Sequence, residues 1–308
     1  MPELPEVQTI VTELNRKLKN RTIKSVIVRA SKMVSVGPLT VSNIRKVNQK
    51  SVNEFMSMLE GQKIVSVTRR AKLLVFDFSG PLSMLVHLKM TGQFIFEDEK
   101  LQKKTGGYYR LLNRPNIPKE HLPSKHTHVV FYFVDKSILY FNDVRKFGYL
   151  KIIRDDEVNK FKELQAFGPE PLDKKFTFNV FRAVVKNADK RKIKEFLLDS
   201  SKVAGIGNIY SDEILYHAKI RPTRTVGSLS NNELETVYKW IPVVLRQAIK
   251  AKGSSVGDFV RTDGQWGSMG KFHFVYGRKG QLCKKCGAII EAIKLGGRTS
   301  CYCPFEQK

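Results

Sequence analysis

The sequence has few cysteines, no long apolar run and a deficit of acidic residues. No stretch of 18 or more apolar residues could cross a membrane, and no signal peptide precedes the first helix, so we expect a soluble intracellular protein. All 4 cysteines fall in the last 26 of 308 residues, a clustering that indicates a metal site rather than a disulfide-stapled secreted fold. With 42% hydrophobic residues, the chain can build cores for two domains, which excludes wholesale disorder.

Basic residues are in large excess. The chain carries 54 Lys and Arg against 29 Asp and Glu, a formal charge of +25, with a sequence pI near 9.9. A compact protein with this imbalance is expected to have a polyanionic partner, and nucleic acid is the first candidate. A lysine-rich proteome is the alternative explanation for the same composition.

The hydrophobic pattern divides the chain into an amino-terminal β-rich part and a helical part. Apolar residues at helical spacing from Val7 to Leu18 predict an amphipathic helix that ends near Asn20. The next residues, up to about Arg154, predict a β-sandwich or flattened barrel of about seven or eight strands. The clearest β-type runs are 23–29, 63–67, 73–78, 83–88, 128–134, 138–141 and 149–153.

After residue 153 the period becomes helical, with helices expected at 157–166, 178–186, 191–198, 209–217 and 231–252. Gly205 and Gly207 precede one helix start, where exposed backbone amides suit a phosphate. The Gly/Ser-rich segment 253–270 is typical of a functional lid. The sequence thus predicts an α+β protein with a β-sandwich domain at 1–154, a helical domain with the lid at 155–270, and a zinc β-hairpin at 271–308.

Two further segments, 31–54 and 97–125, interrupt the β pattern and are expected to be surface excursions, the first with a short helix near 52–59. Neither has a function that its residues indicate.

The first residues, Met1-Pro-Glu-Leu-Pro-Glu6, suggest chemistry. Removal of Met1 would expose the secondary amine of Pro2 beside the carboxylate of Glu3. A terminal amine has a reference pKa near ~8, against ~10.4 for lysine, so far more of it is the free base that forms a Schiff base. The alternative is that these residues only open a helix, because proline and acidic residues favour a first turn.

The motifs along the chain resemble those of bacterial-type formamidopyrimidine-DNA glycosylases, which repair oxidised purines. The match covers nearly the whole length and comprises Pro2-Glu-Leu-Pro-Glu-Val7, Arg69-Arg-Ala-Lys72, His87-Leu-Lys-Met-Thr-Gly92, Lys125-His-Thr-His128, Asp143-Val-Arg-Lys-Phe-Gly148, Gly168-Pro-Glu-Pro-Leu172 and Gly205-Ile-Gly-Asn-Ile-Tyr210. The last motif lies in the family's helix-two-turn-helix element. The resemblance implies a DNA glycosylase with abasic-site (AP) lyase activity in base excision repair.

The resemblance also implies roles for single residues. Pro2 would attack the sugar and Glu3 would transfer protons, with β- and δ-elimination following and no diffusible cofactor needed. Lys72 and Arg298 would support catalysis and, with His87 and Asn208, grip phosphates. Met90, Arg145 and Phe147 match residues that fill the hole left by an extruded base, although Met90 or Phe147 alone would suit a core. The further expected DNA contacts are His126, Lys190 and Lys194, where a solvated lysine is the alternative.

The cysteines depart from the family pattern of two Cys-x2-Cys pairs. Cys283 and Cys286 form one pair, but Glu306 stands where the fourth cysteine belongs after Cys303. Cys301 would compensate if it shares a strand face with Cys303. We therefore expect one structural zinc ion on all four cysteines; the alternatives are three cysteines with Glu306, or a hairpin without metal.

The sequence leaves other functions open as alternatives. An endonuclease VIII type enzyme for oxidised pyrimidines, a non-catalytic binder of damaged DNA and a zinc-ribbon regulator share parts of the pattern, although Leu4 favours the purine enzyme. We expect a monomer that binds duplex DNA with oxidised bases or abasic sites. If the source is bacterial, it would lie in the cytoplasm with the nucleoid. Lesion and opposite-base preference do not follow from the sequence.

Overall fold

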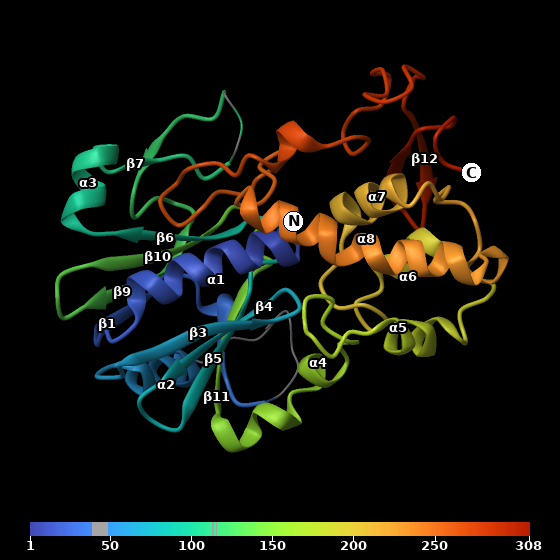
Figure 1. Cartoon of the computed structure of the whole chain (residues 1–308). Helices are drawn as coiled ribbons and strands as arrows, with labels where there is room; N and C mark the ends of the chain where they lie inside the picture. Colours follow the sequence, from blue (N-terminus) through green and yellow to red (C-terminus); the bar gives the residue numbers. More distant parts are fainter. Residues whose placement is uncertain (39–48, 113, 115) are drawn as a thin grey trace. The chain divides into compact units, whose positions relative to one another are not determined.

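The computed structural model describes residues 1–38, 49–112, 114 and 116–308 (Figure 1). The chain forms two compact units. The first comprises Met1–Gln165 and Lys252–Ser268, and the second Ala166–Ala251 and Met269–Lys308. Residues 155–165 and most of the lid segment therefore group with the first unit. The domain boundaries at 154 and 270 stay sequence-based predictions. The compact units differ from the predicted domains in the lid segment, because this segment returns to the first unit and hydrogen-bonds to it.

Helix α1 (Leu4–Leu18) organises the first unit. It begins with a capping box, in which Glu3 and Glu6 each accept a hydrogen bond from the other's backbone, and Pro5 stands in its first turn. Its apolar side, including Val7, Ile10 and Leu14, is buried. Figure 1 shows α1 running between two sheets, with the amino terminus of the chain, marked N, at its start.

The two sheets enclose the core of the first unit. One has the order β1 (Ile23–Val28), β9 (Thr127–Phe133), β10 (Ile138–Asp143) and β6 (Gly92–Glu97). The other has the order β2 (Val34–Val36), β11 (Tyr149–Arg154), β5 (Leu82–His87), β4 (Leu73–Phe78) and β3 (Ile64–Arg70). Phe94 packs against Phe76 and Phe141 with ring centroids 5.7 and 5.2 Å apart, so one aromatic cluster joins the sheets. The seven predicted strands are confirmed, whereas β6 and β2 were not predicted.

The first unit also contains short helical elements between its strands and after its last strand. They are η1 (Ser31–Met33), α2 (Gln49–Leu59), η2 (Asp155–Lys160) and α4 (Lys162–Gln165), the last two replacing the single helix expected at 157–166. Residues 39–48 of the predicted excursion at 31–54 lie outside the described part of the chain. The segment 97–125 is not structureless, since it contains α3 (Glu99–Thr105), β7 (Tyr108–Tyr109) and β8 (Glu120–His121).

Residues 252–268 return to the first unit and bind both α1 and β6. The buried carboxylate of Glu13 accepts hydrogen bonds from the Thr262 backbone amide at 3.1 Å and from Arg261 Nε at 2.6 Å. The Phe96 amide donates to the carbonyl of Thr262 at 2.9 Å. Gly253 and Gly267 lie so close together that a Cβ at Gly267 would collide with the Gly253 carbonyl.

The second unit is helical and ends in a β-hairpin. Its elements are α5 (Phe178–Val185), α6 (Ile193–Leu198), α7 (Asn208–His217), η3 (Val226–Ser228), α8 (Asn231–Lys250), η4 (Met269–Phe272), β12 (Glu291–Leu295) and β13 (Arg298–Tyr302). Ser230 and Glu233 form the capping box that starts α8. Among the described residues, no helix combines the length and apolar character that crossing a bilayer requires.

Candidate active site

The amino terminus of α1 holds Pro2 and Glu3 in a buried position. Met1 is exposed, whereas the side chains of both following residues are buried. The Glu3 amide donates to Glu6 Oε2 at 2.9 Å, and Glu6 Oε1 accepts a hydrogen bond from the Ser254 amide at 2.8 Å. One buried carboxylate therefore fixes both the start of the chain and the start of the lid segment.

Gly253 is required at this junction. Its φ of +82° lies in the left-handed region, and a Cβ there would lie 3.1 Å from the Glu6 carboxylate. The glycine thus allows the lid backbone to approach Glu6 closely enough for the hydrogen bond from Ser254.

The hairpin between β3 and β4 presents Lys72. Ala71 has a φ of +54°, as the tight two-residue turn requires, and the Lys72 side chain is largely buried. Arg69 Nε donates to Gln8 Oε1 at 2.8 Å, which holds the hairpin against α1. Because Pro2 and Glu3 directly precede α1, this contact ties the predicted lysine segment to the helix that follows the predicted nucleophile.

His87 lies at the end of β5, opposite Leu73 in the neighbouring strand. Burial, together with the positive charges of Lys89 and Lys72, lowers the pKa of His87 to about 3. Its Nδ1 accepts a hydrogen bond from the Lys89 amide at 2.9 Å. The imidazole is therefore neutral at pH 7 and can donate a hydrogen bond from Nε2, but it brings no charge to a phosphate.

The structure brings together Met90, Arg145 and Phe147. The Arg145 guanidinium donates to Met90 Sδ at 2.8 Å and lies 4.8 Å from the centroid of the Phe147 ring. All three side chains are exposed. Two apolar groups and a cation on one surface match the expected device for filling an emptied base position.

Asp143 shapes the turn that carries two of these residues. Its fully buried carboxylate accepts hydrogen bonds from the amides of Arg145 at 3.1 Å and Gly148 at 2.7 Å, and from the Thr91 hydroxyl. His128 Nε2 bonds to the Asp143 carbonyl at 2.7 Å, and the Asp143 amide donates to the carbonyl of His126 at 3.0 Å. His126, a predicted DNA contact, thus adjoins the same turn, with a partly exposed side chain.

Within the second unit, Lys194 is not on the surface. Its side chain is 0% exposed, and its Nζ lies 2.6 Å from Asp212 Oδ1 and 3.0 Å from the carbonyl of Asn208. Asp212 also accepts from the Ser300 hydroxyl at 2.6 Å and the Cys301 amide at 3.0 Å. The predicted DNA contact of Lys194 is therefore corrected: the buried ion pair joins α6, α7 and β13. Lys190, by contrast, is exposed.

The same pair positions Asn208 and Arg298. Asn208 Nδ2 donates to the carbonyl of Thr299 at 2.9 Å, beside the exposed Arg298 at the start of β13. Asn208 Oδ1 is buried, and no residue in the described part of the chain hydrogen-bonds to it. The first turn of α7 and the hairpin are thereby joined, which puts two predicted phosphate contacts on neighbouring backbone.

Three of the four cysteines come together. The sulfurs of Cys283, Cys286 and Cys303 lie within 4.8 Å of one another, and those of Cys286 and Cys303 are 3.5 Å apart. Amides of Lys285 and Glu306 donate to Cys283 and Cys303 at 3.5 and 3.4 Å. In a tetrahedral zinc site with Zn–S near ~2.3 Å, sulfurs would be roughly 3.8 Å apart, so the group fits a metal ion.

Cys301 does not join the three-sulfur group, which differs from the expectation of four cysteine ligands. Strand β13 ends at Tyr302, so Cys303 already lies in the following turn and the two cysteines do not share a strand face. The Cys301 side chain is buried, and its amide donates to Asp212. Glu306 forms an ion pair with Lys285 Nζ at 2.6 Å.

Comparison with known proteins agrees with this geometry. Residues 1–150 match the model of the formamidopyrimidine-DNA glycosylase N-terminal domain, and residues 167–260 match that of its H2TH domain. Formamidopyrimidine-DNA glycosylases of Lactiplantibacillus plantarum and Listeria monocytogenes are 36% and 37% identical over 308 residues, which is 100% of each chain.

The chain belongs to the formamidopyrimidine-DNA glycosylase family. Its fold is similar to that of the Lactococcus lactis Fpg in complex with DNA containing an abasic site, with a TM-score of 0.81, 31% identity and 100% of both chains covered. The same Fpg in complex with DNA containing N7-benzyl-Fapy-dG gives the same values. The chain is thus a DNA glycosylase of DNA repair with an H2TH domain, and the family prediction from its motifs is confirmed.

Several residues that shape this glycosylase site were not predicted as site residues. Glu6 could have been found, because an acidic residue three positions after Glu3 is the signature of a capping box. Asp143 and His128 lie inside motifs that resemble those of the family. Nothing in the spacing of these two residues indicates that they support the turn at 143–148. Their roles depend on the pairing of distant strands.

Proposed function

We propose that this glycosylase removes oxidised purines from duplex DNA and then cleaves the strand as an AP lyase, with the amine of Pro2 as nucleophile. The observation that carries the proposal is the buried position of Pro2 and Glu3 at the start of α1, tied through Glu6 to the lid. Ordering of both segments by one carboxylate supports a nucleophile and a base-covering loop that act together.

The proposed chemistry begins when the free amine of Pro2 attacks C1' of the damaged nucleotide and the C1'–N bond to the base breaks. The leaving base takes up a proton that Glu3 can transfer. The bound nitrogen then loses its proton and expels O4', which takes up a proton as the sugar ring opens and the C1' iminium forms. This iminium acidifies the C2' proton, and its removal permits β-elimination of the 3' phosphate and then δ-elimination of the 5' phosphate. The negative charges that develop in these steps would be stabilised by Lys72, Arg298 and the other expected phosphate contacts, His87 and Asn208.

Base extrusion would rely on the exposed group of Met90, Arg145 and Phe147. Unstacking a base costs a few kcal/mol, and an apolar wedge with a cation offsets this cost by occupying the vacated space. The phosphate contacts of Lys190, Asn208 and Arg298 would hold the strand without reading its sequence.

One structural zinc ion is proposed on Cys283, Cys286 and Cys303, where it would hold the hairpin that carries Arg298. The fourth ligand would come from outside the three-sulfur group. Glu306 is the nearest chemical candidate in sequence, since its amide already donates to Cys303, but its carboxylate would have to leave Lys285.

The test is borohydride trapping on a duplex with 8-oxoguanine opposite cytosine, followed by mass mapping of the adduct. A covalent complex at Pro2 is expected, because borohydride reduces the imine to a stable amine. A form with an additional residue ahead of Pro2 is the matched control and should give no adduct. An adduct at a lysine would contradict the role of Pro2, and no adduct at all would favour a non-catalytic binding protein. More adduct on an oxidised-pyrimidine duplex would favour the endonuclease VIII type specificity.

A further inference from the structure

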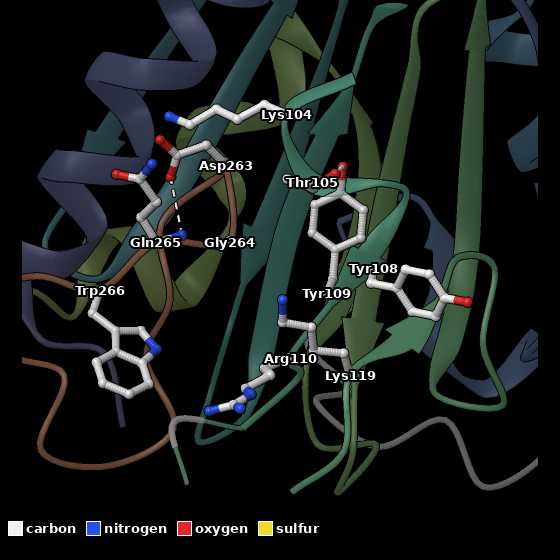
Figure 2. Close-up of a pocket in the computed structure, with 10 residues that line it drawn as sticks. All are labelled: Lys104, Thr105, Tyr108, Tyr109, Arg110, Lys119, Asp263, Gly264, Gln265 and Trp266. Atoms are coloured by element: carbon white, nitrogen blue, oxygen red, sulfur yellow. Dashed lines mark hydrogen bonds between the residues drawn. The ribbon is translucent and has the colours of Figure 1, made fainter. Parts of the chain in front are cut away.

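Residues 104–110 and 119 and the tip of the lid segment line an open cavity that contains none of the residues predicted to take part in the glycosylase reaction. Its volume is about 580 Å³, within the range of small-molecule sites. Figure 2 shows Trp266 on one side and Tyr109 and Lys119 on the other, with Lys104 at one end and Arg110 at the opposite end. All these residues belong to the first unit, and none is among the predicted catalytic or DNA-binding residues.

Aromatic side chains line this cavity, and two of them are exposed. Trp266 is 49% and Tyr108 47% exposed, whereas Tyr109 is buried. Gly264 has a φ of +73°, and a Cβ there would lie 3.0 Å from the Tyr109 ring, so the lid tip packs directly on the 97–125 segment. The wall is therefore well defined. Tyr108 packs against the His121 ring, with centroids 3.6 Å apart, so the exposed ring of Trp266 is the one that suits the flat face of a nucleobase.

The cavity is also electropositive. Lys104, Arg110 and Lys119 line it, and the one carboxylate, Asp263, already lies 3.4 Å from the Arg261 guanidinium. Arg110 Nε is buried and has no hydrogen-bond partner in the described ranges. A buried donor without a partner is costly, and a turn of the Arg110 side chain towards the cavity would satisfy it with an anionic oxygen.

We propose that this cavity binds an unpaired nucleotide of a DNA strand. The base would stack on Trp266, and the phosphate would be bound by Arg110 with Lys104 and Lys119. Further exposed basic residues of the same segment, Lys100, Lys103 and Arg114, lie outside the cavity lining and favour a strand with several phosphates over a free nucleotide. The inference rests on the DNA-binding part of the proposed function and adds a single-strand contact to it.

Tryptophan fluorescence tests the proposal. The chain has 2 tryptophans, and Trp240→Phe leaves Trp266 as the only reporter. Adding a short single-stranded oligothymidylate to this variant should quench or shift the Trp266 emission, because a base stacks on the indole. No spectral change while the oligonucleotide binds, as followed by anisotropy, would overturn the site.

Charge reversal supplies the second arm. In the same background, Lys119→Glu should weaken the fluorescence-detected affinity by about tenfold, as expected for loss of one phosphate contact. Lys24→Glu, an exposed lysine on β1 outside the cavity, is the matched control and should change the affinity much less. Equal effects of the two variants would contradict a specific site, and thymidine monophosphate binding as tightly as the oligonucleotide would overturn the assignment to a strand.

Excision is measured separately, with unmodified protein on a fully paired 8-oxoguanine duplex. Failure there would overturn the proposed glycosylase specificity, whereas loss of the Trp266 response alone would overturn only the cavity assignment.

Discussion

Glu6 is the residue on which the amino terminus and the lid depend together. Its buried carboxylate accepts the amides of Glu3 and Ser254, whose hydrogen bonds measure 2.9 and 2.8 Å. A carboxylate offers two acceptor oxygens, and each is used here by a different segment. The geometry of the nucleophile and of the lid is thus set by one side chain that takes no part in the proposed bond changes.

Glu6→Gln should therefore loosen both segments while preserving side-chain volume. A glutamine has one acceptor oxygen, so one buried amide loses its partner, at a cost of about 1–3 kcal/mol in the free energy of unfolding. Thermal unfolding and hydrogen exchange at the Ser254 amide measure this. The control is Glu99→Gln, which removes an exposed ion pair with Lys103 and should cost about 0.5 kcal/mol or less.

His87 makes stability depend on pH in a defined direction. Its pKa in the folded state is about 3, below the value of about 6.5 for an unfolded chain. Between these two pKa values the unfolded chain binds more protons than the folded chain. The contribution of His87 to the free energy of unfolding is therefore fully present above pH 6.5 and is lost as the pH decreases towards 3. At pH 5 the loss from this one group is about 2 kcal/mol.

Replacement by a side chain that does not titrate tests this. His87→Gln should flatten the dependence of the urea unfolding midpoint on pH between 5 and 7. An unchanged slope would show that His87 does not titrate as its burial requires.

At the scale of elements, the buried Lys194–Asp212 pair joins two helices to the β-hairpin. Lys194→Met should destabilise the second unit by about 3–5 kcal/mol, because it leaves Asp212 buried without its counter-charge. Lys194→Met with Asp212→Leu should recover part of this loss. The control is Lys190→Met, at an exposed lysine, which should leave urea unfolding unchanged and weaken DNA binding. If Lys194→Met instead weakens DNA binding and keeps normal stability, Lys194 contacts DNA directly, as the sequence predicts.

The hairpin cysteines give an element-scale prediction with a built-in control. Cys303→Ser should reduce bound zinc, measured by elemental analysis, to nearly none, and should loosen the hairpin that carries Arg298. Cys301→Ser should retain the metal, because its sulfur lies outside the three-sulfur group. Equal zinc loss in both variants would return Cys301 to the ligand set.

The sequence predicts elements better than it predicts what their side chains touch. Alternating apolar residues identify most strands. They do not identify β6, because its run, Gly92-Gln-Phe-Ile-Phe-Glu97, begins at the last residue of a motif assigned to DNA contact. Lys194 resembled any surface lysine, since its burial depends on Asp212 from another helix. The prediction that Cys301 is a zinc ligand differs from the structure for a similar reason. The residue at which β13 ends decides whether Cys301 and Cys303 share a strand face, and the spacing of the cysteines does not show where the strand ends.

For the whole molecule, the charge of +25 leads to a prediction on salt. Binding to undamaged duplex should weaken steeply with ionic strength, with a log–log slope of roughly −0.9 for each phosphate neutralised. Fluorescence anisotropy at several salt concentrations measures the slope. A shallow slope would mean that the excess of lysine reflects composition and not a basic DNA-binding surface.

The first unit is assembled from segments that the ribosome makes at very different times. Glu6 and Glu13 bind amides of residues 254 and 262, which follow them by 248 and 249 positions. At a synthesis rate of about 5–20 residues per second, these carboxylates await their partners for roughly 10–50 s. A nascent chain thus exposes its amino terminus long before the lid exists, and the first unit cannot be completed until residues 166–251 of the second unit have been synthesised.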